Sequence, residues 1–541
     1  MSTYVRINQL KLNIDENEDM LLHKAAEKLK INDKHIIGFK IVKKSIDARK
    51  KNEIMFSYSV EAEVANENLI NSKVLNNNIM LTKAQEYVFP KCGNEILVNR
   101  PVIIGSGPAG LFCGYFLALK GYKPIIIERG QAVDERTETV EHFFKTGKLD
   151  TESNVQFGEG GAGTFSDGKL NTTVKDPSGR NMLVLDIFVK FGADKSISYI
   201  NKPHIGTDVL CKIVKNIRNE IIKLGGEVHF STRLDDINEE SGKVKSVVVT
   251  DLKNGATKTI DTDVLVLAIG HSARDTFKKL YEKKIYMEPK PFAMGVRVEH
   301  KQNLINRAMY GEKYMNKLGA ADYKVTYTCE NGRGVYSFCM CPGGYVVNAS
   351  SEDGRLAVNG MSYSKRDGEN ANSAIIVTVR TDDYGADNPL NGIEFQRKLE
   401  ENAYKACGGK IPVQKYGDFI TNTVSNSFGK VNPNTRGEVG FADINLILPE
   451  FICDSIKEAM PAFGRMIEGF DDKDTLMLAV ESRTSSPVRI VRNENYVCNI
   501  EGIYPCGEGA GYAGGITSAA IDGVRVFEAI CQKYKGNLTE L

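Results

Sequence analysis

Hydrophobic spacing separates a small N-terminal module from the rest of the chain. Residues 4 to 64 predict a short α/β unit, in which the apolar positions of residues 5 to 12 indicate a strand and those of Met20 to Leu29 an amphipathic helix. A hairpin follows, and its second strand alternates apolar and polar positions over residues 54 to 64. Residues 65 to 99 are rich in Asn and lack sustained periodicity, so we expect a linker there and assign residues 1 to 92 to the module and its linker.

A complete βαβ unit begins at residue 101. Residues 101 to 104 form an apolar strand, Gly105 to Gly110 a GxGxxG turn, residues 111 to 120 a helix and residues 124 to 127 a second strand, which ends in Glu128. The glycines of such a turn let the backbone approach a pyrophosphate, the helix N-terminus attracts the phosphate charge, and the acid accepts hydrogen bonds from an adenosine ribose. Because the acid disfavours a 2′-phosphate, the pattern predicts FAD or NAD rather than NADP.

Two further glycine-rich segments favour FAD. They are residues 154 to 169 and residues 504 to 516, the second followed by a helical pattern over residues 517 to 533. The second segment formally repeats GxGxxG, but only 27 residues follow Gly514 in the 541-residue chain, too few for a second βαβ unit. We therefore expect both segments, with the apolar strand that ends at Gly270, to lie along one long cofactor whose reactive ring faces the late helix N-terminus.

Composition and charge exclude several classes of protein. The 70 Lys and Arg residues nearly balance the 69 Asp and Glu residues, so a net charge of +1 gives no general attraction to nucleic acid or an anionic membrane. No apolar run is long enough for a membrane span, and the N-terminus lacks the apolar core of a signal peptide. The 11 Cys residues include no CxxC pair, which argues against a disulfide scaffold or a zinc ribbon. We expect a cytoplasmic protein with no metal site and no membrane partner.

A short basic segment leaves a second class of function open. Residues 43 to 51, at the tip of the N-terminal hairpin, read KKSIDARKK. A solvated hairpin tip is the simpler interpretation, and a docking surface for RNA or an acidic protein partner is the alternative. Because the module lacks interleaved aromatic residues of a single-strand binding surface, a nucleic-acid partner is the less favoured hypothesis.

The ordered set of motifs resembles the FAD flavoproteins of the glutathione reductase type, and more closely a largely uncharacterised family of bacterial FAD-dependent dehydrogenases. The segments that carry the closer resemblance are residues 156–170 (QFGEGGAGTFSDGKL), 202–208, 267–275 (LAIGHSARD), 290–300 (KPFAMGVRVEH), 335–350, 359–374, 481–490 and 505–516 (PCGEGAGYAGGI). The resemblance implies an FAD-dependent oxidoreductase and leaves its substrate open.

The resemblance also implies which residues contact FAD. The pyrophosphate would lie on the first glycine loop, the adenosine ribose on Glu128, and the pyrimidine edge of the flavin near Gly515 and Ile516. Glu508 stands where many relatives have Asp near the ribityl chain. The complete expected set is Gly105, Gly107, Pro108, Ala109, Gly110, Glu128, Arg129, Gly161, Ala162, Gly163, Thr164, Gly270, Gly507, Glu508, Gly515 and Ile516.

Three residues are candidates for catalysis. His271 follows the strand that ends at Gly270, and Arg297 and Arg483 lie in polar segments where cations would suit an anionic substrate or a reduced flavin. A cap on the strand end and ordinary ion pairs are the simpler interpretations of these residues. Cys339 and Cys341 suggest redox chemistry, but on one regular strand their Cα atoms would be about 7 Å apart, at the limit for a disulfide, so small core residues are favoured.

Together the patterns predict an α/β flavoprotein in three parts. A Rossmann-like FAD-binding domain is expected to combine residues 93–289 and 478–541, with a mixed α/β substrate domain of residues 290–477 inserted between them, after the N-terminal module. We expect two-electron oxidation or reduction of an unidentified small molecule, for which an anion is one candidate class. NAD(P)H is a candidate transient electron donor, since no second nucleotide domain is visible. The oligomeric state is left open.

Overall fold

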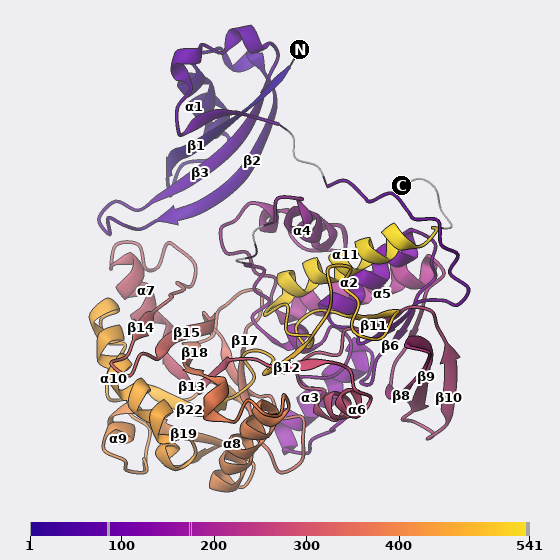
Figure 1. Cartoon of the computed structure of the whole chain (residues 1–541). Helices are drawn as coiled ribbons and strands as arrows, with labels where there is room; N and C mark the ends of the chain where they lie inside the picture. Colours follow the sequence, from indigo (N-terminus) through magenta and orange to yellow (C-terminus); the bar gives the residue numbers. More distant parts are fainter. Residues whose placement is uncertain (1, 84–86, 173, 175, 537–541) are drawn as a thin grey trace. The chain divides into compact units, whose positions relative to one another are not determined.

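The computed structural model describes residues 2–83, 87–172, 174 and 176–536, and it divides into two compact units (Figure 1). The smaller unit takes its residues from Met1–Val88, Lys175–His204 and Asn306–Ala321. The larger unit takes its residues from Phe89–Val174, Ile205–Ile305 and Asp322–Leu541. Two segments distant from the N-terminus in sequence therefore pack with the N-terminal module.

The smaller unit is built on a four-stranded antiparallel sheet in the order β2-β3-β1-β4. Its elements are β1 (Thr3–Asn13), α1 (Met20–Leu29), β2 (Ile36–Asp47), β3 (Met55–Val64), β4 (Ile79–Thr82) and, from later in the chain, α4 (Arg180–Lys190). Alternate residues of β3, among them Tyr58 and Val60, are buried in one core with Leu21 and Ala25 of α1. The predicted strand, helix and hairpin are therefore confirmed.

Strand β4 lies in the segment that we expected to be a linker. Ile79 pairs with Ile7 and Thr82 pairs with Tyr4, and Ile79 is buried in the core of the module. The expectation of a linker is wrong for Ile79–Thr82, because a strand of four residues is too short to show an alternating pattern in the sequence.

The larger unit contains a five-stranded parallel sheet in the order β24-β11-β5-β6-β7. Its strands are β5 (Val102–Ile104), β6 (Ile125–Ile127), β7 (Glu227–His229), β11 (Leu265–Leu267) and β24 (Ile503–Pro505), and its main helices are α2 (Pro108–Leu119), α3 (Val133–Thr146), α5 (Thr207–Lys223) and α11 (Ile516–Lys533). Helix α2 is apolar on all sides because it is enclosed by the sheet, α5 and α11. Strand β24, from late in the chain, pairs with β11 in this sheet.

A second group of strands completes the larger unit. The antiparallel strands β8 (Thr232–Glu240), β9 (Lys243–Asp251) and β10 (Thr257–Asp261) precede α6 (Arg274–Glu282), and β12 (Met287–Pro289) pairs with β23 (Val488–Ile490). A seven-stranded mixed sheet in the order β14-β15-β18-β13-β22-β19-β21 follows. Its strands are β13 (Phe292–Lys301), β14 (Thr326–Thr328), β15 (Gly334–Cys341), β18 (Asn370–Val379), β19 (Ile411–Lys415), β21 (Val439–Phe441) and β22 (Leu476–Glu481).

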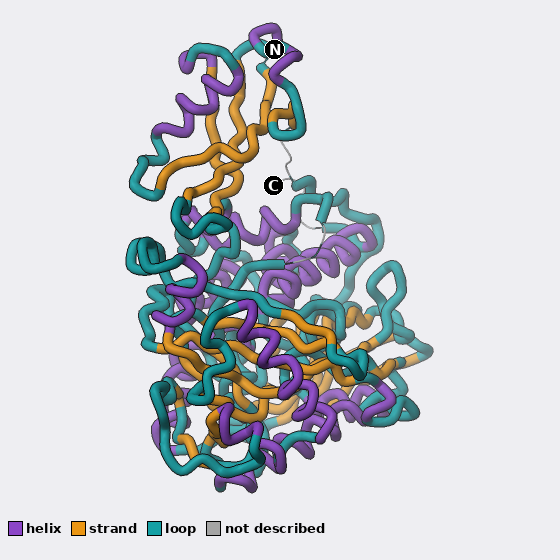
Figure 2. The backbone as a smooth tube through the Cα atoms, turned by 90° about the vertical axis from the view of Figure 1, so that its left-hand side faces the viewer, coloured by secondary structure: helices purple, strands orange, loops and turns teal. Residues whose placement is uncertain are grey.

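Three short strands and four helices accompany the mixed sheet. They are β16 (Tyr345–Asn348), β17 (Val358–Met361), β20 (Thr435–Arg436), α7 (Gln302–Tyr310), α8 (Asn391–Cys407), α9 (Tyr416–Ile420) and α10 (Glu450–Met466), of which α7 passes at residue 306 into the segment assigned to the smaller unit. Figure 2 shows the strands of this unit with helices outside them. The boundary that we placed at residue 477 falls inside β22, whereas the predicted α/β class with a Rossmann-like sheet and a second mixed sheet is confirmed.

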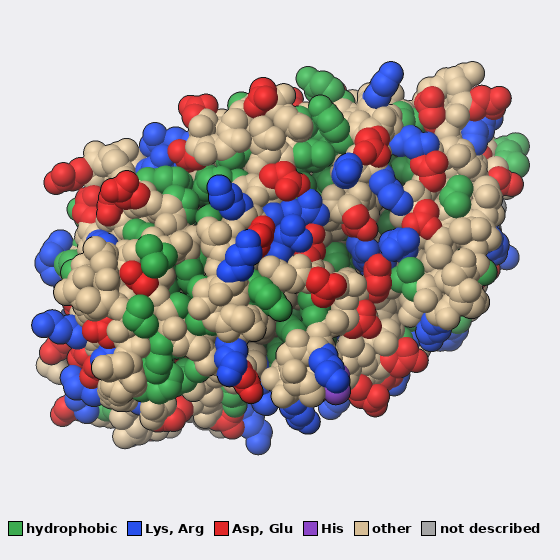
Figure 3. Space-filling view, turned by 90° about the horizontal axis from the view of Figure 1, so that it is seen from below, with side chains coloured by type: hydrophobic (Ala, Val, Ile, Leu, Met, Phe, Trp, Pro, Cys, Tyr) green, Lys and Arg blue, Asp and Glu red, His purple; other side chains and the backbone are tan. Residues whose placement is uncertain are grey.

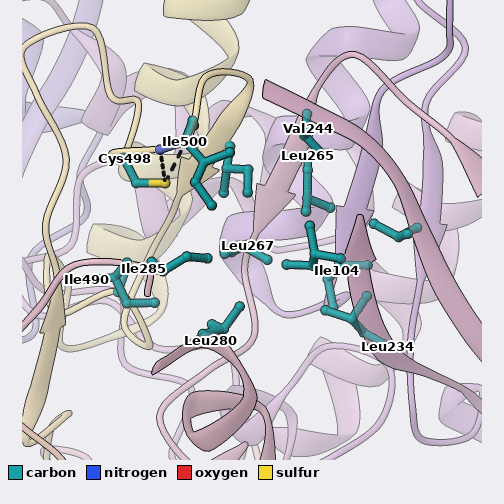
Figure 4. Packing of buried hydrophobic residues seen from close by; sticks show 14 of the residues in the cluster. Ile104, Leu234, Val244, Leu265, Leu267, Leu280, Ile285, Ile490, Cys498 and Ile500 are labelled. Carbon is teal, nitrogen blue, oxygen red and sulfur yellow. Dashed lines mark hydrogen bonds between the residues drawn. The ribbon is translucent and has the colours of Figure 1, made fainter. Parts of the chain in front are cut away.

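One apolar core joins the parallel sheet to its neighbours (Figure 4). Ile104 and Leu267 from the parallel strands, Leu234 from β8, Leu280 from α6 and Ile490 from β23 belong to a single buried cluster, and Figure 4 shows their side chains directed toward a common centre. Burial of side chains of this size stabilises a fold by roughly 1.5–3 kcal/mol each. The ends of the parallel strands are therefore held rigidly where the candidate site begins.

Candidate functional site

A cavity of about 330 Å³ opens at the carboxyl ends of the parallel strands. Ile104 and Ile127, which end β5 and β6, and Ala268, which follows β11, all line the cavity. The crevice at this edge of an open α/β sheet is where such folds bind ligands. Much of its wall is glycine backbone, from Gly105, Gly107, Gly158, Gly161, Gly163, Gly168, Gly270, Gly514 and Gly515.

The glycines in and beside this wall serve two purposes. A Cβ at Gly110 would overlap the carbonyl oxygen of Gly105, so this glycine lets α2 pack closely on β5. A Cβ at Gly107 would meet no protein atom nearer than 3.9 Å, and Cβ atoms at Gly270 and Gly514 would meet none within 4 Å. The second set therefore presents bare backbone to the cavity, beside the N-terminus of α2, where no side chain caps the backbone N–H groups.

Arg136 holds the glycine-rich loop that follows α3. Its guanidinium is fully buried and donates to the carbonyl oxygens of Asn154 (2.9 Å), Val155 (3.0 Å), Gly158 (3.2 Å), Glu159 (2.7 Å) and Gly161 (2.9 Å). Burial lowers the pKa of Arg136 to about 10, which leaves the side chain charged at neutral pH. A single cation thus donates to five carbonyl groups of the loop. Those of Gly158, Glu159 and Gly161 also accept from Gly161 or Thr164, whereas those of Asn154 and Val155 depend on Arg136 among the described residues.

The carboxylate of Glu128 connects three backbone segments. One oxygen accepts hydrogen bonds from the backbone N–H and the hydroxyl of Ser106, both at 2.8 Å, and the other accepts from the N–H groups of Gly130 (3.0 Å) and Gly158 (3.1 Å). These donors use the four acceptor positions of a carboxylate. Glu128 lines the cavity, but a ribose hydroxyl would have to replace one of these donors, most simply the rotatable hydroxyl of Ser106.

His271 and Glu508 form a pair on the cavity wall. Nδ1 of His271 lies 3.0 Å from Oε1 of Glu508, and because a carboxylate only accepts, Nδ1 carries the proton. Nε2 of His271 is buried without a hydrogen-bond partner among the described residues. Glu508 belongs to the late glycine segment, so the pair links the end of β11 to the loop before α11.

Charged side chains line the cavity on the side of the mixed sheet. Lys169, Glu481 and Arg483 all reach it, together with Asn359 and Cys339. Burial raises the pKa of the Glu481 carboxyl above its usual value. This wall differs from the glycine side because it offers both acidic and cationic groups to a bound molecule.

Of two buried arginines near this wall, Arg483 lines the cavity and Arg297 lies behind the wall residues. Arg483 donates to both carboxylate oxygens of Glu400, at 3.1 and 2.9 Å, while Nη1 lies 3.3 Å from the hydroxyl of Ser272. Arg297 is fully buried behind the wall and donates from Nε to Glu481 (2.9 Å) and from Nη2 to Asn359 (3.3 Å). Arg297 therefore fixes two wall residues and does not itself line the cavity.

The structure brings most of the sequence-predicted residues to this one cavity. Those that line it are Gly105, Gly107, Pro108, Ala109, Glu128, Arg129, Gly161, Ala162, Gly163, Gly270, His271, Arg483, Glu508, Gly515 and Ile516. Those that do not are Gly110, Thr164, Gly507 and Arg297. Arg129 is held at the rim by Asp275, at 2.9 and 3.0 Å, with its guanidinium over the ring of Phe157.

Sequence reasoning missed several residues of the site. Lys169, Asn359 and Glu481 lie inside segments that carried the resemblance, and their polar character amid Gly and Ser was a usable signal. Arg136 gave no such signal, because a single Arg on an amphipathic helix is ordinarily a surface residue. Among the described residues no cluster of His, Cys, Asp or Glu is arranged to hold a metal ion.

Comparison with protein families gives three matches along the chain. Residues 99–278 match the pyridine nucleotide-disulphide oxidoreductase family, residues 291–484 match the C-terminal domain of FAD-dependent proteins, and residues 4–63 match a domain of unknown function, DUF8436. An uncharacterised protein of Clostridium beijerinckii is 48% identical over 535 residues, which cover 98% of this chain and 99% of that protein.

Solved structures resemble the chain at lower similarity. An FAD complex of glycerol-3-phosphate dehydrogenase from Bacillus halodurans has 10% identity and a TM-score of 0.35, covering 80% of this chain and 64% of that one. A flavoprotein/dehydrogenase from Cytophaga hutchinsonii has 12% identity and a TM-score of 0.35, covering 80% and 78%. A glycine oxidase from Bacillus cereus has 13% identity and a TM-score of 0.31, covering 80% and 94%.

The fold, the glycine-lined cavity and the family matches define an FAD-dependent oxidoreductase. The chain belongs to the same family of FAD-dependent proteins as the uncharacterised clostridial protein, which it matches over nearly its whole length. None of the helices within residues 2–83, 87–172, 174 and 176–536 combines the length and the hydropathy that a bilayer crossing requires.

Proposed function

We propose that the protein transfers two electrons between FAD and a small molecule that binds at the charged wall of the cavity. One observation carries this proposal: the same cavity has glycine backbone on one side and Lys169, Glu481 and Arg483 on the other. Such a site can hold a long cofactor along its backbone side and leave charged side chains for a second molecule. Because two of these side chains are cations, an anionic substrate is the class that we favour.

The residues along the glycine side fit FAD. Gly107 and the N-terminus of α2 would receive the pyrophosphate, because free backbone N–H groups and the helix dipole favour its negative charge. Glu128 and Arg129 would lie at the adenosine end, and Gly515 and Ile516, which begin α11, at the flavin end. When bound, FAD supplies the two-electron chemistry.

The protein's own side chains would bind and orient the substrate. His271, with Nδ1 held by Glu508, would offer Nε2 to a hydrogen-bonding group or exchange a proton there. Arg483 would hold negative charge on the substrate, since Glu400 already fixes its guanidinium in one orientation. Arg297 would act as a positioning residue through Glu481.

Stopped-flow measurement of flavin absorbance across a panel of two-electron donors tests this proposal. We expect at least one small anionic compound, or NADH or NADPH visiting transiently, to bleach the flavin of the full-length protein. Denaturation of the purified protein should release FAD. Release of NAD, or of no nucleotide from well-folded protein, would overturn the arrangement of the cofactor proposed above.

The alternative of macromolecular docking has weaker support. At the hairpin tip of residues 43–51, Lys44 pairs with Glu18 (2.6 Å) and Arg49 pairs with Asp47 (2.7 Å), which reduces the charge that is free for a partner. On the face drawn in Figure 3, acidic and basic side chains are interspersed.

We also propose that the protein acts in the reducing cytoplasm, since its 11 Cys residues are free thiols.

A further inference from the structure

Cys339 and Cys341 lie on a distorted part of β15 and not on a regular strand. Phe338 pairs with Ala374 of β18 and Cys341 pairs with Asn372, so three steps along β15 oppose two steps along β18. Cys339 has a φ of 42°, which is uncommon for a residue other than glycine. Such a bulge breaks strand alternation and redirects a side chain, so the regular spacing assumed from the sequence does not apply here.

The bulge gives the two thiols different environments. Cys339 lines the cavity, whereas Cys341 is completely buried. The Cys341 thiol turns back toward its neighbour and donates to the Cys339 carbonyl oxygen at 3.2 Å. Nη1 of Arg297 donates to that carbonyl at 3.1 Å and lies 3.9 Å from Sγ of Cys341. Cys339, which lines the cavity, and Cys341, which is buried, thus both lie beside the buried cation of Arg297.

The charges around Cys339 favour its thiolate. The neighbouring Cys341 side chain is the largest cause that lowers the pKa of Cys339 to about 6; burial raises it, Arg297 and Lys169 lower it, and Glu481 raises it. Burial raises the pKa of Cys341, as it does for the half-buried thiols of Cys211 and Cys407. Only the thiolate is a strong nucleophile, so Cys339 is set apart from these other cysteines.

We propose that Cys339 and Cys341 form a hydroperoxide-reactive pair on the wall of the cavity, with Cys339 as the nucleophile and Cys341 as the resolving thiol. The Cys339 thiolate attacks one oxygen of the hydroperoxide; an S–O bond forms, the O–O bond breaks, and the departing oxygen takes up the proton that the Cys339 thiol released on ionisation and leaves as an alcohol or as water. The Cys341 sulfur then attacks the sulfenic acid, forms the disulfide and releases water. Overall two thiols lose two electrons and two protons to the hydroperoxide.

Mass spectrometry of the reduced full-length protein tests this pair directly. Both cysteines lie on the single tryptic peptide between Arg333 and Arg355. With one equivalent of hydrogen peroxide, we expect this peptide to lose the mass of two hydrogen atoms while Cys211 and Cys407 stay reduced. In Cys341→Ser, dimedone should trap a sulfenic acid at Cys339. In Cys339→Ser, the peptide should remain unmodified, because Cys341 has no access to the peroxide.

Alkylation of the wild-type protein provides a test that needs no variant. At pH 6 iodoacetamide should label Cys339 about tenfold faster than Cys211 or Cys407, since thiolate fraction outweighs the lower nucleophilicity of an acidic thiol. Equal labelling of the three cysteines, or wild-type protein in which peroxide leaves the Arg333–Arg355 peptide reduced, would overturn the proposal. Because both readouts are chemical modification, they do not depend on FAD content or on turnover.

Discussion

Arg136 donates a hydrogen bond of 2.9 Å from Nη1 to the carbonyl oxygen of Gly161. Arg136 lies on α3, and Gly161 is the loop residue whose Cα would lie 3.9 Å from a Cβ at Gly107 of the first glycine turn. The same guanidinium reaches further carbonyl groups back to Asn154, so one side chain sets the course of the loop along the cavity. The planar fork of an Arg provides these donors in fixed directions, which a Lys cannot do.

The variant Arg136→Ala should therefore lose bound FAD. The carbonyl groups of Asn154 and Val155 would lose their donor, three further loop carbonyls would lose one of two donors, and we expect the free energy of unfolding to fall by about 3–5 kcal/mol. The ratio of flavin to protein absorbance after purification and a urea titration measure the two effects. Arg307→Ala, at an exposed Arg, is the matched control and should change neither. Full flavin content in Arg136→Ala would show that the loop holds its course without this side chain.

Gly107→Val should prevent FAD binding and leave the fold intact. The new side chain would extend into the cavity, because no protein atom lies within 3.9 Å of a Cβ at this position. Flavin content and the thermal unfolding of the apoprotein measure the outcome. Gly319→Val places the same side chain where nothing lies within 4 Å, and it should keep full flavin content. A variant at Gly107 with normal flavin content would mean that the pyrophosphate lies elsewhere.

The glycine loops could be predicted from the sequence because the demand for glycine is local. Gly110 must be a glycine for α2 to approach β5, and the GxGxxG pattern between an apolar strand and a helix shows this requirement in the sequence. Arg136 and the bulge at Cys339 could not be predicted, since their roles depend on carbonyl groups and cations that distant segments bring to them. The short strand β4 was missed because pairing with β1, and not its own pattern, makes it a strand.

His271→Ala and Arg483→Ala should separate substrate chemistry from cofactor binding. Each variant should keep its FAD, because the glycine loops remain, but its flavin should be reduced at least about 10²-fold more slowly by the donor that the panel identifies. Stopped-flow rates and flavin content are the measurements, and Lys283→Ala, at an exposed Lys on the surface, is the control.

Arg483→Ala should also lower the free energy of unfolding by about 1–3 kcal/mol, since Glu400 keeps only Arg274 as a cationic partner among the described residues. Unchanged reduction rates in both variants would show that His271 and Arg483 have only a structural role.

Glu299 should make stability depend on pH in the opposite sense from an ordinary surface acid. Burial raises the pKa of Glu299 to about 7 in the folded protein, against an ordinary value of 4.5. Its contribution is therefore fully present below pH 4.5 and is lost as the pH rises through 7, by up to about 3 kcal/mol. Burial lowers the pKa of His300 to about 4, so its contribution runs the other way and is lost as the pH falls from 6.5 toward 4.

Comparison of wild type with Glu299→Gln isolates the Glu299 effect, because His300 is common to both proteins. Gln can still accept the hydrogen bonds from Asn370 and from the backbone N–H of Asn434. In urea titrations at pH 4.5 and pH 8, the stability of wild type relative to the variant should fall at the higher pH. A difference that does not change with pH would show that the Glu299 carboxyl titrates in the ordinary range.

Variants of the basic hairpin tip, residues 43–51, distinguish a small-molecule oxidoreductase from a protein that binds a macromolecule. If the tip grips a phosphate backbone, a gel shift with total cellular RNA should weaken as salt rises and disappear when Arg49, Lys50 and Lys51 are changed to Glu. We expect no shift at low salt, because Lys44 and Arg49 already have acidic partners and the backbone of Lys44 is paired with Tyr199 and Asn201. The triple variant should keep its flavin and its reduction rate, since the cavity is lined by residues of the larger unit. Salt-sensitive RNA binding lost in the triple variant would contradict this expectation and favour a macromolecular partner.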